Sequence, residues 1–427
     1  MTTLHDSPDV HRRAGWLPRD HGDLESWLTG HRERVQAQGE RVAMHPVLTE
    51  FQRLVDTDPI VHMYVHQMIE QVPRTKPYRN RHLHSFEQML RLINGVLTMA
   101  PEYGESAVVL PLCAIFDWTM GTPAGFAAFR DARINAMLKK ILTAWCGFLD
   151  SAASLYVLND SPSGWKCPAA RRAISIEQFE HDPQDAHWGF GSWNDFFTRR
   201  FKDGKRPVAS PENEKVIISA CESTPYRIAT GVKRHDRFWI KSQPYSLQNM
   251  LANDESVDEF VDGTVYQAFL TAMNYHRWNS PVAGTIVRAF VEGGTYYSEA
   301  VSESWDVLLP PDSQPYLAHV AARAIILIRA DDPVIGLLAF VGVGIAEVSS
   351  CLIDQNIVPG YHVAKGEELG YFQFGGSTYC LVFRPGVIAD FALAAIPRAN
   401  DSNMPQVPVR SKLAVASERV TRRSAAG

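Results

Sequence analysis

The chain has 427 residues, 45% of them hydrophobic and 21% charged, with a formal net charge of -5 at pH 7. This length exceeds that of a usual single domain, and the apolar content can fill more than one core. The negative net charge and the lack of long Lys/Arg runs argue against a nucleic-acid-binding protein. A small soluble substrate suits this composition better.

The cysteine pattern and the apolar segments indicate in which cellular compartment the protein is found. Six cysteines are scattered without a C-x-x-C pair, which is typical of reduced thiols in the cytosol. The first 20 residues lack the apolar region of a secretory signal. The most apolar stretch, Val320 to Val348, is interrupted by charged residues and a proline. We therefore expect a cytoplasmic protein without stable membrane insertion, and no metal site is predicted.

The first half of the chain has helical periodicity. Residues 1–40 are polar with weak periodicity, so a flexible N-terminal tail is predicted there. Over residues 41–165 apolar side chains recur at helical spacing, as in Phe86, Met89, Leu90, Ile93 and Leu97. This predicts a helical N-terminal domain that ends before a boundary near residues 165–190.

The second half reads as short β-rich runs separated by Gly, Pro and Asp. The predicted strands are Val216–Ala220, Arg237–Lys241, Thr264–Leu270, Thr285–Val291, Ala324–Ala330, Ile335–Val343, Glu347–Ile353 and Tyr379–Phe383. A mainly β domain is expected over residues 190–398, with a flexible C-terminal tail over residues 399–427. The predicted fold class is α+β, a helical N-terminal unit followed by a mainly β core.

The segment Phe374-Gly-Gly-Ser-Thr378 carries the most informative pattern. Two glycines remove side-chain sterics, so the carbonyl of Gly376 can approach the Ser377 hydroxyl in a geometry that other residues resist. Attack there would shift the acyl group from nitrogen to oxygen. Elimination from the ester would release Gly376 as a carboxylate and leave a dehydroalanine, which hydrolyses to a pyruvoyl group. Ser377 would thereby become an electrophilic cofactor.

Two ordinary structures compete for the same residues. A β-turn would use the glycines for positive φ and the serine for a local hydrogen bond. A phosphate-binding loop is disfavoured, because the lysine that should follow is absent and a strand comes next.

Two further residues are candidates for proton chemistry. His276 stands between Tyr275 and Trp278, whose rings would partly desolvate it, so it is the candidate general base. Glu222 directly follows an apolar strand and would need a partner there, which a histidine oriented by the acid would supply. The alternatives are a structural histidine beside aromatic rings and an exposed acid at a strand end.

These segments occur in the order and with the neighbours of the phosphatidylserine decarboxylase family, and the resemblance covers roughly residues 193–387. Trp193-Asn-Asp-Phe-Phe-Thr-Arg-Arg-Phe-Lys-Asp-Gly-Lys-Arg-Pro207 resembles the family's W-x-x-F-F-x-R-x-L-K-x-G-x-R-P motif. Trp239-Ile-Lys-Ser-Gln-Pro-Tyr-Ser-Leu247 resembles its W-I-K-G-x-x-Y-S-L strand. The helical unit and the Ala-Cys-Glu-Ser sequence look like the branch that contains fungal L-tryptophan decarboxylases of the psilocybin type.

The resemblance implies a set of functional residues. In this family an Asp, His and Ser set drives self-cleavage at L-G-S-T or G-G-S-T, which implies cleavage between Gly376 and Ser377. Glu222 stands where the family usually has aspartate. The family's Y-H-R-x-H pattern places His276 on the first histidine, tied more to decarboxylation, and Asn279 on the second, the usual partner of the acid in cleavage. Because asparagine cannot act as a base, either His276 serves both steps or cleavage is slowed.

The resemblance further implies a carboxy-lyase whose cofactor is a pyruvoyl group derived from Ser377. Cleavage would leave two chains that stay associated, and a primary amine would lose CO₂ through a Schiff base. A free aromatic L-amino acid, with L-tryptophan converted to tryptamine, is the preferred substrate because no membrane anchor is apparent. Tyr275 and Trp278 are candidates for lining an indole pocket. Phosphatidylserine, converted to phosphatidylethanolamine, is the alternative substrate.

A non-enzymatic alternative rests on Val363-Ala-Lys-Gly-Glu-Glu-Leu-Gly370, which resembles the turn and strand of biotinyl and lipoyl carrier modules. Lys365 would then be the modified residue. The Met-Lys-Met tip of such carriers is missing. A pyridoxal-phosphate decarboxylase is disfavoured because no lysine lies in a recognisable motif for that cofactor.

Overall fold

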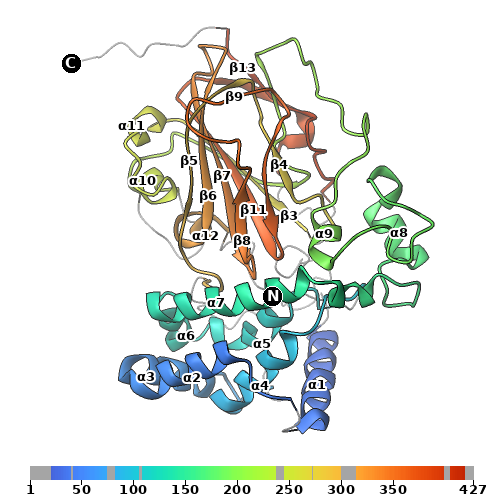
Figure 1. The fold of residues 1–427 in the computed structure, drawn as a ribbon. Coiled ribbons are helices and arrows are strands. Elements are labelled where there is room, and N and C mark those ends of the chain that lie inside the picture. Colours follow the sequence, from blue (N-terminus) through green and yellow to red (C-terminus); the bar gives the residue numbers. More distant parts are fainter. Residues whose placement is uncertain are drawn as a thin grey trace, which may run out of the picture.

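The computed structural model forms a helical unit and a β unit that contact each other (Figure 1). Helices from the first third of the chain lie together, and the strands of the second half form the β unit beside them. This confirms the predicted α+β fold class. The structure describes residues 21–39, 42–74, 82–104, 108–236, 245–271, 273–299, 314–398 and 404–418.

Apolar stripes and polar caps define the helices. Ser85 accepts a hydrogen bond from Gln88 N–H at the start of α4, and Asp131 accepts from Arg133 N–H at the start of α7. The helices and 3₁₀ turns of the first half are α1 (His21–Gln38), α2 (Pro46–Thr57), α3 (Pro59–Glu70), α4 (Phe86–Val96), α5 (Pro111–Met120), α6 (Pro123–Ala128), α7 (Ala132–Leu149), η4 (Ala152–Val157), α8 (Pro168–Ile174), η5 (Ile176–Gln178) and α9 (Trp193–Phe197).

The β unit contains three antiparallel sheets and a few short helices. Its strands are β1 (Val216–Ile218), β2 (Thr224–Thr230), β3 (Thr264–Leu270), β4 (Arg277–Asn279), β5 (Gly284–Glu292), β6 (Arg323–Ala330), β7 (Leu337–Ala346), β8 (Ser350–Ile353), β9 (His362–Val363), β10 (Glu368–Gln373), β11 (Gly376–Phe383), β12 (Ile388–Phe391) and β13 (Lys412–Ala416). The helical segments are α10 (Leu247–Met250), α11 (Val257–Phe260), α12 (Gln314–Val320) and η7 (Leu393–Ala395).

The largest sheet has seven strands in the order β2-β3-β11-β7-β6-β5-β9. β11 therefore lies inside the sheet, hydrogen-bonded to β3 on one side and to β7 on the other. All of its residues are buried, as are all of those in β7. A strand that is covered on both faces reads as a continuous apolar run, which explains why these segments showed no alternation in the sequence.

Two helices of the N-terminal unit contact the segments next to β11. The Cys113 N–H of α5 donates to a carboxyl oxygen of Glu347, just after β7. The indole of Trp145 in α7 packs edge-on against Phe374, just before β11, with ring centroids 5.4 Å apart. Figure 1 shows the sheet ends near β8 and β11 facing these helices. The helical unit thus lies against the end of the sheet that carries Ser377.

The predicted tails require correction. Helix α1 occupies residues 21–38 of the predicted N-terminal tail, and its buried Leu24 and Leu28 join the main core. Strand β13 lies in the predicted C-terminal tail and pairs with both β1 and β12. α1 is mostly polar and β13 has only five residues, so their few apolar side chains gave a weak periodic signal. The predicted strand Arg237–Lys241 lies outside the described residues.

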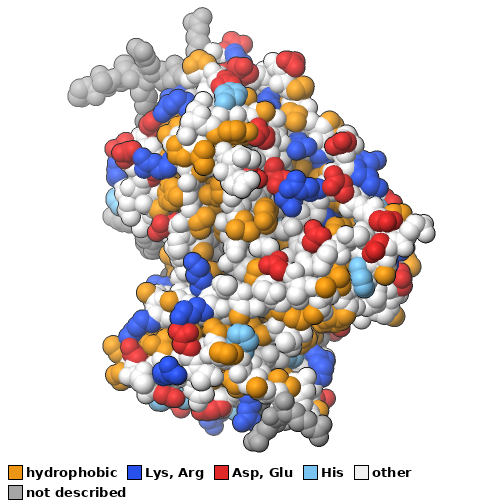
Figure 2. Space-filling view, in the orientation of Figure 1, with side chains coloured by type: hydrophobic (Ala, Val, Ile, Leu, Met, Phe, Trp, Pro, Cys, Tyr) orange, Lys and Arg blue, Asp and Glu red, His pale blue; other side chains and the backbone are white. Residues whose placement is uncertain are grey.

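The surface of the molecule carries charges of both signs (Figure 2). On the face drawn in Figure 2, positive and negative side chains are interspersed over both units. Within the described ranges, no helix is long and apolar enough to cross a membrane.

Candidate active site

Ser377 is held inside the central sheet. Its backbone is paired with Leu270 of β3 and Gly344 of β7, and its side chain is fully buried. The Ser377 hydroxyl oxygen is buried without a hydrogen-bond partner among the described residues. A buried hydroxyl without a partner lowers the stability of the folded state by about 1–3 kcal/mol, so most buried hydroxyls have a partner. The next hydroxyl, on Thr378, is satisfied by the carbonyl of Ala268 at 2.8 Å.

The backbone just before Ser377 is irregular and has no room for side chains at Gly375. The pairing of β11 with β7 shifts register between Gly376 and Ser377, which marks a β-bulge. Gly375 has a φ of +143°, and a Cβ there would lie 2.4 Å from Val348 N and 2.5 Å from Ala346 O. Glycine is required at this position, and the peptide bond expected to break lies next to it.

His276 lies close to this segment. Its ring stacks on Phe197 with centroids 3.8 Å apart, and Phe197 also contacts Phe374 at 4.9 Å. Backbone groups of Phe197, Asn274 and Thr271 are close enough to the His276 ring to affect its pKa, and Thr271 directly follows the cross-strand partner of Ser377. Ser377 and His276 therefore share one buried region, although the Ser377 hydroxyl does not bond to the imidazole.

The surroundings of His276 keep its ring neutral. Burial lowers the pKa of His276 well below its ordinary value, and the charge of Arg199 lowers it further, while these backbone groups oppose the change. A neutral imidazole at pH 7 can accept a proton, which is what a general base must do.

Arg199 is a site residue that sequence reasoning missed. It is almost fully buried, donates to the carbonyl of Met273 at 2.9 Å, and its guanidinium lies 4.4 Å from the ring centre of Phe179. Burial lowers the pKa of Arg199 to about 9, and Glu222 partly opposes this. The available signal was its place in the Trp193–Pro207 segment, where Arg199 matches the first arginine of the family's W-x-x-F-F-x-R-x-L-K-x-G-x-R-P motif.

Glu222 is buried and fully engaged. Its carboxylate accepts from Arg206 Nη2 at 2.6 Å and Nε at 3.1 Å, and from Val409 N–H at 2.8 Å. The contacts described for Glu222 include neither Ser377 nor His276. Glu222 therefore joins the Trp193–Pro207 segment to the C-terminal segment. It acts on His276 indirectly, because its charge raises the pKa of Arg199 and the charge of Arg199 lowers the pKa of His276.

Asn279 occupies β4 and is fully buried. Its side-chain amide donates to the carbonyl of Gly366 at 2.9 Å, and its backbone N–H donates to Ala220 O at 2.8 Å. The residue in the place of the second histidine thus lies beside the strand that leads to Glu222, and its role in the structure is a hydrogen bond between segments.

Glu347 is a second residue that sequence reasoning missed. It is fully buried between β7 and β8, has a φ of +62°, and accepts a hydrogen bond from Cys113 of α5. It is the first residue of the strand predicted over Glu347–Ile353. An acid within an otherwise apolar run was the available signal.

The aromatic candidates for a substrate pocket have packing roles. Trp278 is fully buried in a hydrophobic core within the β unit. Its ring centroid lies 5.3 Å from that of Phe340 and 4.8 Å from that of Phe372. Tyr275 packs on Phe201 at 4.7 Å. The rings nearest to the cleavage segment are those around Phe374, which come from α7 and α9: Trp145, Trp193 and Phe197.

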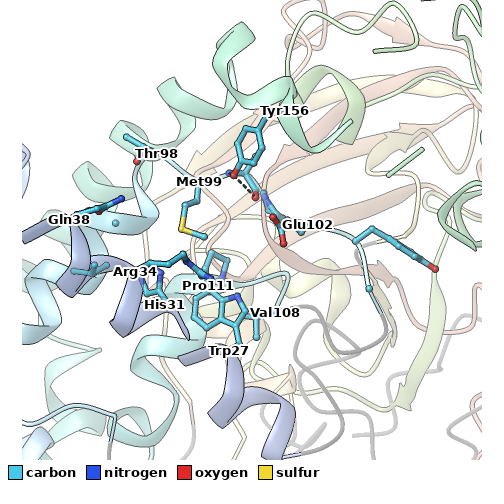
Figure 3. A pocket seen from close by; sticks show the side chains of 16 residues that line it. Trp27, His31, Arg34, Gln38, Thr98, Met99, Glu102, Val108, Pro111 and Tyr156 are labelled. Atoms are coloured by element: carbon cyan, nitrogen blue, oxygen red, sulfur yellow. Dashed lines mark hydrogen bonds between the residues drawn. The ribbon is translucent and has the colours of Figure 1, made fainter. Parts of the chain in front are cut away.

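A cavity of about 670 Å³ lies in the helical unit and is lined by both aromatic and charged side chains (Figure 3). Trp27, His31 and Arg34 come from α1, and Tyr156 closes another side through a hydrogen bond with Ala100. Pro111, the first residue of α5, also lines it. Ser377, His276 and Glu222 are not among its lining residues, so it is separate from the candidate cleavage site.

Two other predictions concern metals and Lys365. Within the described ranges, no cluster of three or more His, Cys, Asp or Glu side chains could hold a metal ion. The Lys365 ammonium donates to the carbonyls of Ser210 at 3.0 Å and Asn213 at 2.8 Å. This lysine is tied to backbone, whereas a carrier module presents its lysine at a free turn.

Comparisons with known proteins identify the family. Two protein-family models, both described as phosphatidylserine decarboxylase, match residues 45–174 and 193–399. Decarboxylase iboD of Amanita muscaria is 39% identical over 304 residues, which cover 66% of this chain and 86% of the relative.

Two further relatives extend the comparison. The L-tryptophan decarboxylase of Psilocybe cubensis is 33% identical over 411 residues, covering 90% of this chain and 91% of that protein. Phosphatidylserine decarboxylase proenzyme 3 of Schizosaccharomyces pombe is 31% identical over 201 residues, covering 47% and 19%. The carrier-module alternative is therefore wrong. The chain belongs to the phosphatidylserine decarboxylase family and is a carboxy-lyase of this pyruvoyl-dependent family.

Proposed function

We propose that the chain cleaves itself between Gly376 and Ser377, converts Ser377 to a pyruvoyl group, and removes CO₂ from a free aromatic L-amino acid, with L-tryptophan as the preferred substrate. The observation that carries the proposal is the buried Ser377 hydroxyl without a partner, at a bulge next to a sterically required glycine. A hydroxyl that is not engaged elsewhere is available to attack the adjacent carbonyl.

The cleavage uses atoms that the chain itself provides. The Ser377 oxygen bonds to the carbonyl carbon of Gly376, the carbon–nitrogen bond breaks, and the hydroxyl proton ends on the freed amine of Ser377. Loss of the Ser377 Cα proton then expels Gly376 as a carboxylate. The dehydroalanine that remains takes up a proton on Cβ to become an imine, which water hydrolyses with release of ammonia. The β3 and β7 backbones that flank Ser377 hold the reacting bond in place during these steps.

His276 is the proposed proton carrier. Its neutral ring lies in the same buried region as Ser377 and can take the Ser377 proton. Asn279 has no basic nitrogen, so His276 serves both cleavage and the later return of a proton to the substrate. When formed, the pyruvoyl group would supply a carbonyl that accepts electrons as CO₂ leaves.

Glu222 is proposed as a positioning residue. Its carboxylate stabilises the buried charge of Arg199, and Arg199 in turn favours the neutral form of His276. Through Arg206 and Val409 it also ties together the two segments that flank this region. The longer glutamate reaches Arg206 in a bidentate geometry, which suits this role.

The choice of substrate rests on which relatives extend over the whole chain. The relatives named L-tryptophan decarboxylase align over 90% of this chain, helical unit included. The phosphatidylserine decarboxylase proenzyme of Schizosaccharomyces pombe aligns over 47%.

Phosphatidylserine is the second candidate, because both matching family models carry that description. The two substrates are distinguished by CO₂ release from free L-tryptophan and from phosphatidylserine vesicles, measured on the same purified enzyme, with L-alanine as a non-aromatic control. The proposal predicts release from L-tryptophan well above release from L-alanine. Release from the vesicles alone would reverse the assignment of substrate.

A further inference from the structure

Helix α5 begins without a cap of its own. All ten of its residues are buried, and its N-cap residue, Leu110, forms no side-chain hydrogen bond to the first turn. The first backbone N–H groups of a helix have no partner within the helix, so a buried helix start needs an acceptor from elsewhere. The N–H of Cys113 finds that acceptor in Glu347, which is 234 residues away in the sequence.

Glu347 in turn adopts a costly backbone conformation. A φ of +62° is unfavourable for a residue with a Cβ and persists only where the surroundings enforce it. The carboxyl group is fully buried at the start of α5, where it accepts the hydrogen bond from Cys113. The hydrogen bond to Cys113 therefore gives one N–H of the helix start an acceptor and one carboxyl oxygen of Glu347 a donor.

The turn at Glu347 presses directly on the cleavage segment. A Cβ on Gly375 would lie 2.5 Å from the carbonyl carbon of Glu347 and 2.4 Å from Val348 N, so these backbones are in close contact. Ala346, the preceding residue, is the cross-strand partner of Gly376 at the bulge. The position of Glu347 thus determines the space left for Gly375 and Gly376.

We propose that Glu347 is a positioning residue for self-cleavage, through which helix α5 fixes the bulge at Gly376 and Ser377. This inference rests on the proposed self-cleavage and adds a function for the helical unit. The carboxyl group acts as a hydrogen-bond acceptor for α5, so its shape and acceptor oxygen are needed and its negative charge is not.

The test follows cleavage of the full-length chain with time during cell-free synthesis, on denaturing gels and by intact mass. Glu347→Ala removes the acceptor and should slow cleavage about tenfold or more, the rate effect expected when a capping interaction that holds the reacting geometry is lost. Glu347→Gln keeps an acceptor oxygen and should cleave within about threefold of the original chain. Equal rates for Glu347→Ala and the original chain would overturn the proposal, and so would a Gln variant as slow as the Ala variant.

Cys113 allows the same contact to be broken from the helix side. Cys113→Pro removes the N–H while the first turn of a helix still accepts proline, and Cys113→Ala is the matched control that retains the N–H. The Pro variant should be slow and the Ala variant normal. This pair carries the test if Glu347→Ala does not fold, and normal cleavage of Cys113→Pro would contradict the proposal.

Hydroxylamine identifies the step that is affected. It cuts an accumulated ester between Gly376 and Ser377 but leaves the original amide intact. Because Glu347 is proposed to act on the geometry of the first attack, the uncleaved Glu347→Ala chain should resist hydroxylamine, and its cutting would overturn the proposal. An original chain that never cleaves would refute the proposed function itself, whereas equal cleavage of both chains would refute only the role of Glu347.

Discussion

Burial determines what each polar side chain of the candidate site can do. Ser377 and His276 are both fully buried, so water neither solvates the hydroxyl nor stabilises a protonated ring. The serine and the histidine could be predicted from their local sequences, because glycines and aromatic neighbours suggest their chemistry. Arg199 could not, since its effect on His276 arises from a fold that brings the two segments together.

Replacement of Arg199 should change the pH dependence of the enzyme. The charge of Arg199 lowers the pKa of His276, so Arg199→Gln should raise that pKa towards its ordinary value. A group with a raised pKa becomes protonated at higher pH, and the acid limb of CO₂ release should therefore shift to higher pH. The measurement is the pH profile of kcat/KM between pH 5 and 8.

The neighbouring arginine provides the control for this experiment. Arg200 is more exposed, pairs with Glu368 at 3.2 Å, and is not among the groups that shift the pKa of His276. Arg200→Gln should leave the profile unchanged. An unchanged profile for Arg199→Gln, in a variant that folds normally, would show that His276 does not titrate in the rate-determining step.

At the scale of elements, the central sheet and helix α5 together shape the cleavage segment. β3 and β7 hold both sides of β11, and the turn after β7 contacts Gly375. Apolar and β-branched runs predicted β3, β5, β6 and β7 close to their observed bounds, and β6 and β7 gave the longest runs because they are buried on both faces. β10 was missed, since its Glu368 and Gly370 resemble a turn. The contact of α5 with Glu347 has no local sequence signal.

Gly375→Ala should block cleavage. The new Cβ would meet backbone atoms of the β7–β8 turn at 2.4–2.5 Å, at a φ of +143° that disfavours alanine. We expect a loss of at least about 2 kcal/mol in the free energy of unfolding and an uncut chain. Denaturant unfolding and intact mass measure the two effects.

Gly293→Ala is the matched control, because nothing lies within 4 Å of the Cβ position there. It should cleave normally and change the free energy of unfolding by less than about 0.5 kcal/mol. Normal cleavage of the Gly375→Ala chain would mean that the tight backbone at this position has no part in the reaction.

At the scale of the whole molecule, the proposed cleavage would divide a single interwoven core. The short chain would contribute β11 to the middle of the seven-stranded sheet, and β12 and β13 to the sheet that contains β1. The tail predicted over residues 399–427 includes β13, which explains how the end of the short chain is anchored.

The two fragments should therefore stay together after cleavage. Removal of β11 would expose β3 and β7 along their whole pairing edges, together with a continuous apolar surface. We expect one native species in size-exclusion chromatography or native mass spectrometry that separates only in denaturant. Separation of the short chain under native conditions would contradict the pairing described for β11.

The most direct test of the account is the intact mass of the purified enzyme under denaturing conditions, with Ser377→Ala as the uncut reference and Ser417→Ala as the control. The account predicts one fragment of residues 1–376 with a free carboxylate on Gly376, and a second fragment of residues 378–427 that carries an N-terminal pyruvoyl group. Ser417→Ala should give the same two fragments with one oxygen fewer in the smaller, while Ser377→Ala should stay whole and release no CO₂. A single uncut chain of 47.8 kDa that decarboxylates its substrate at full rate would contradict the account.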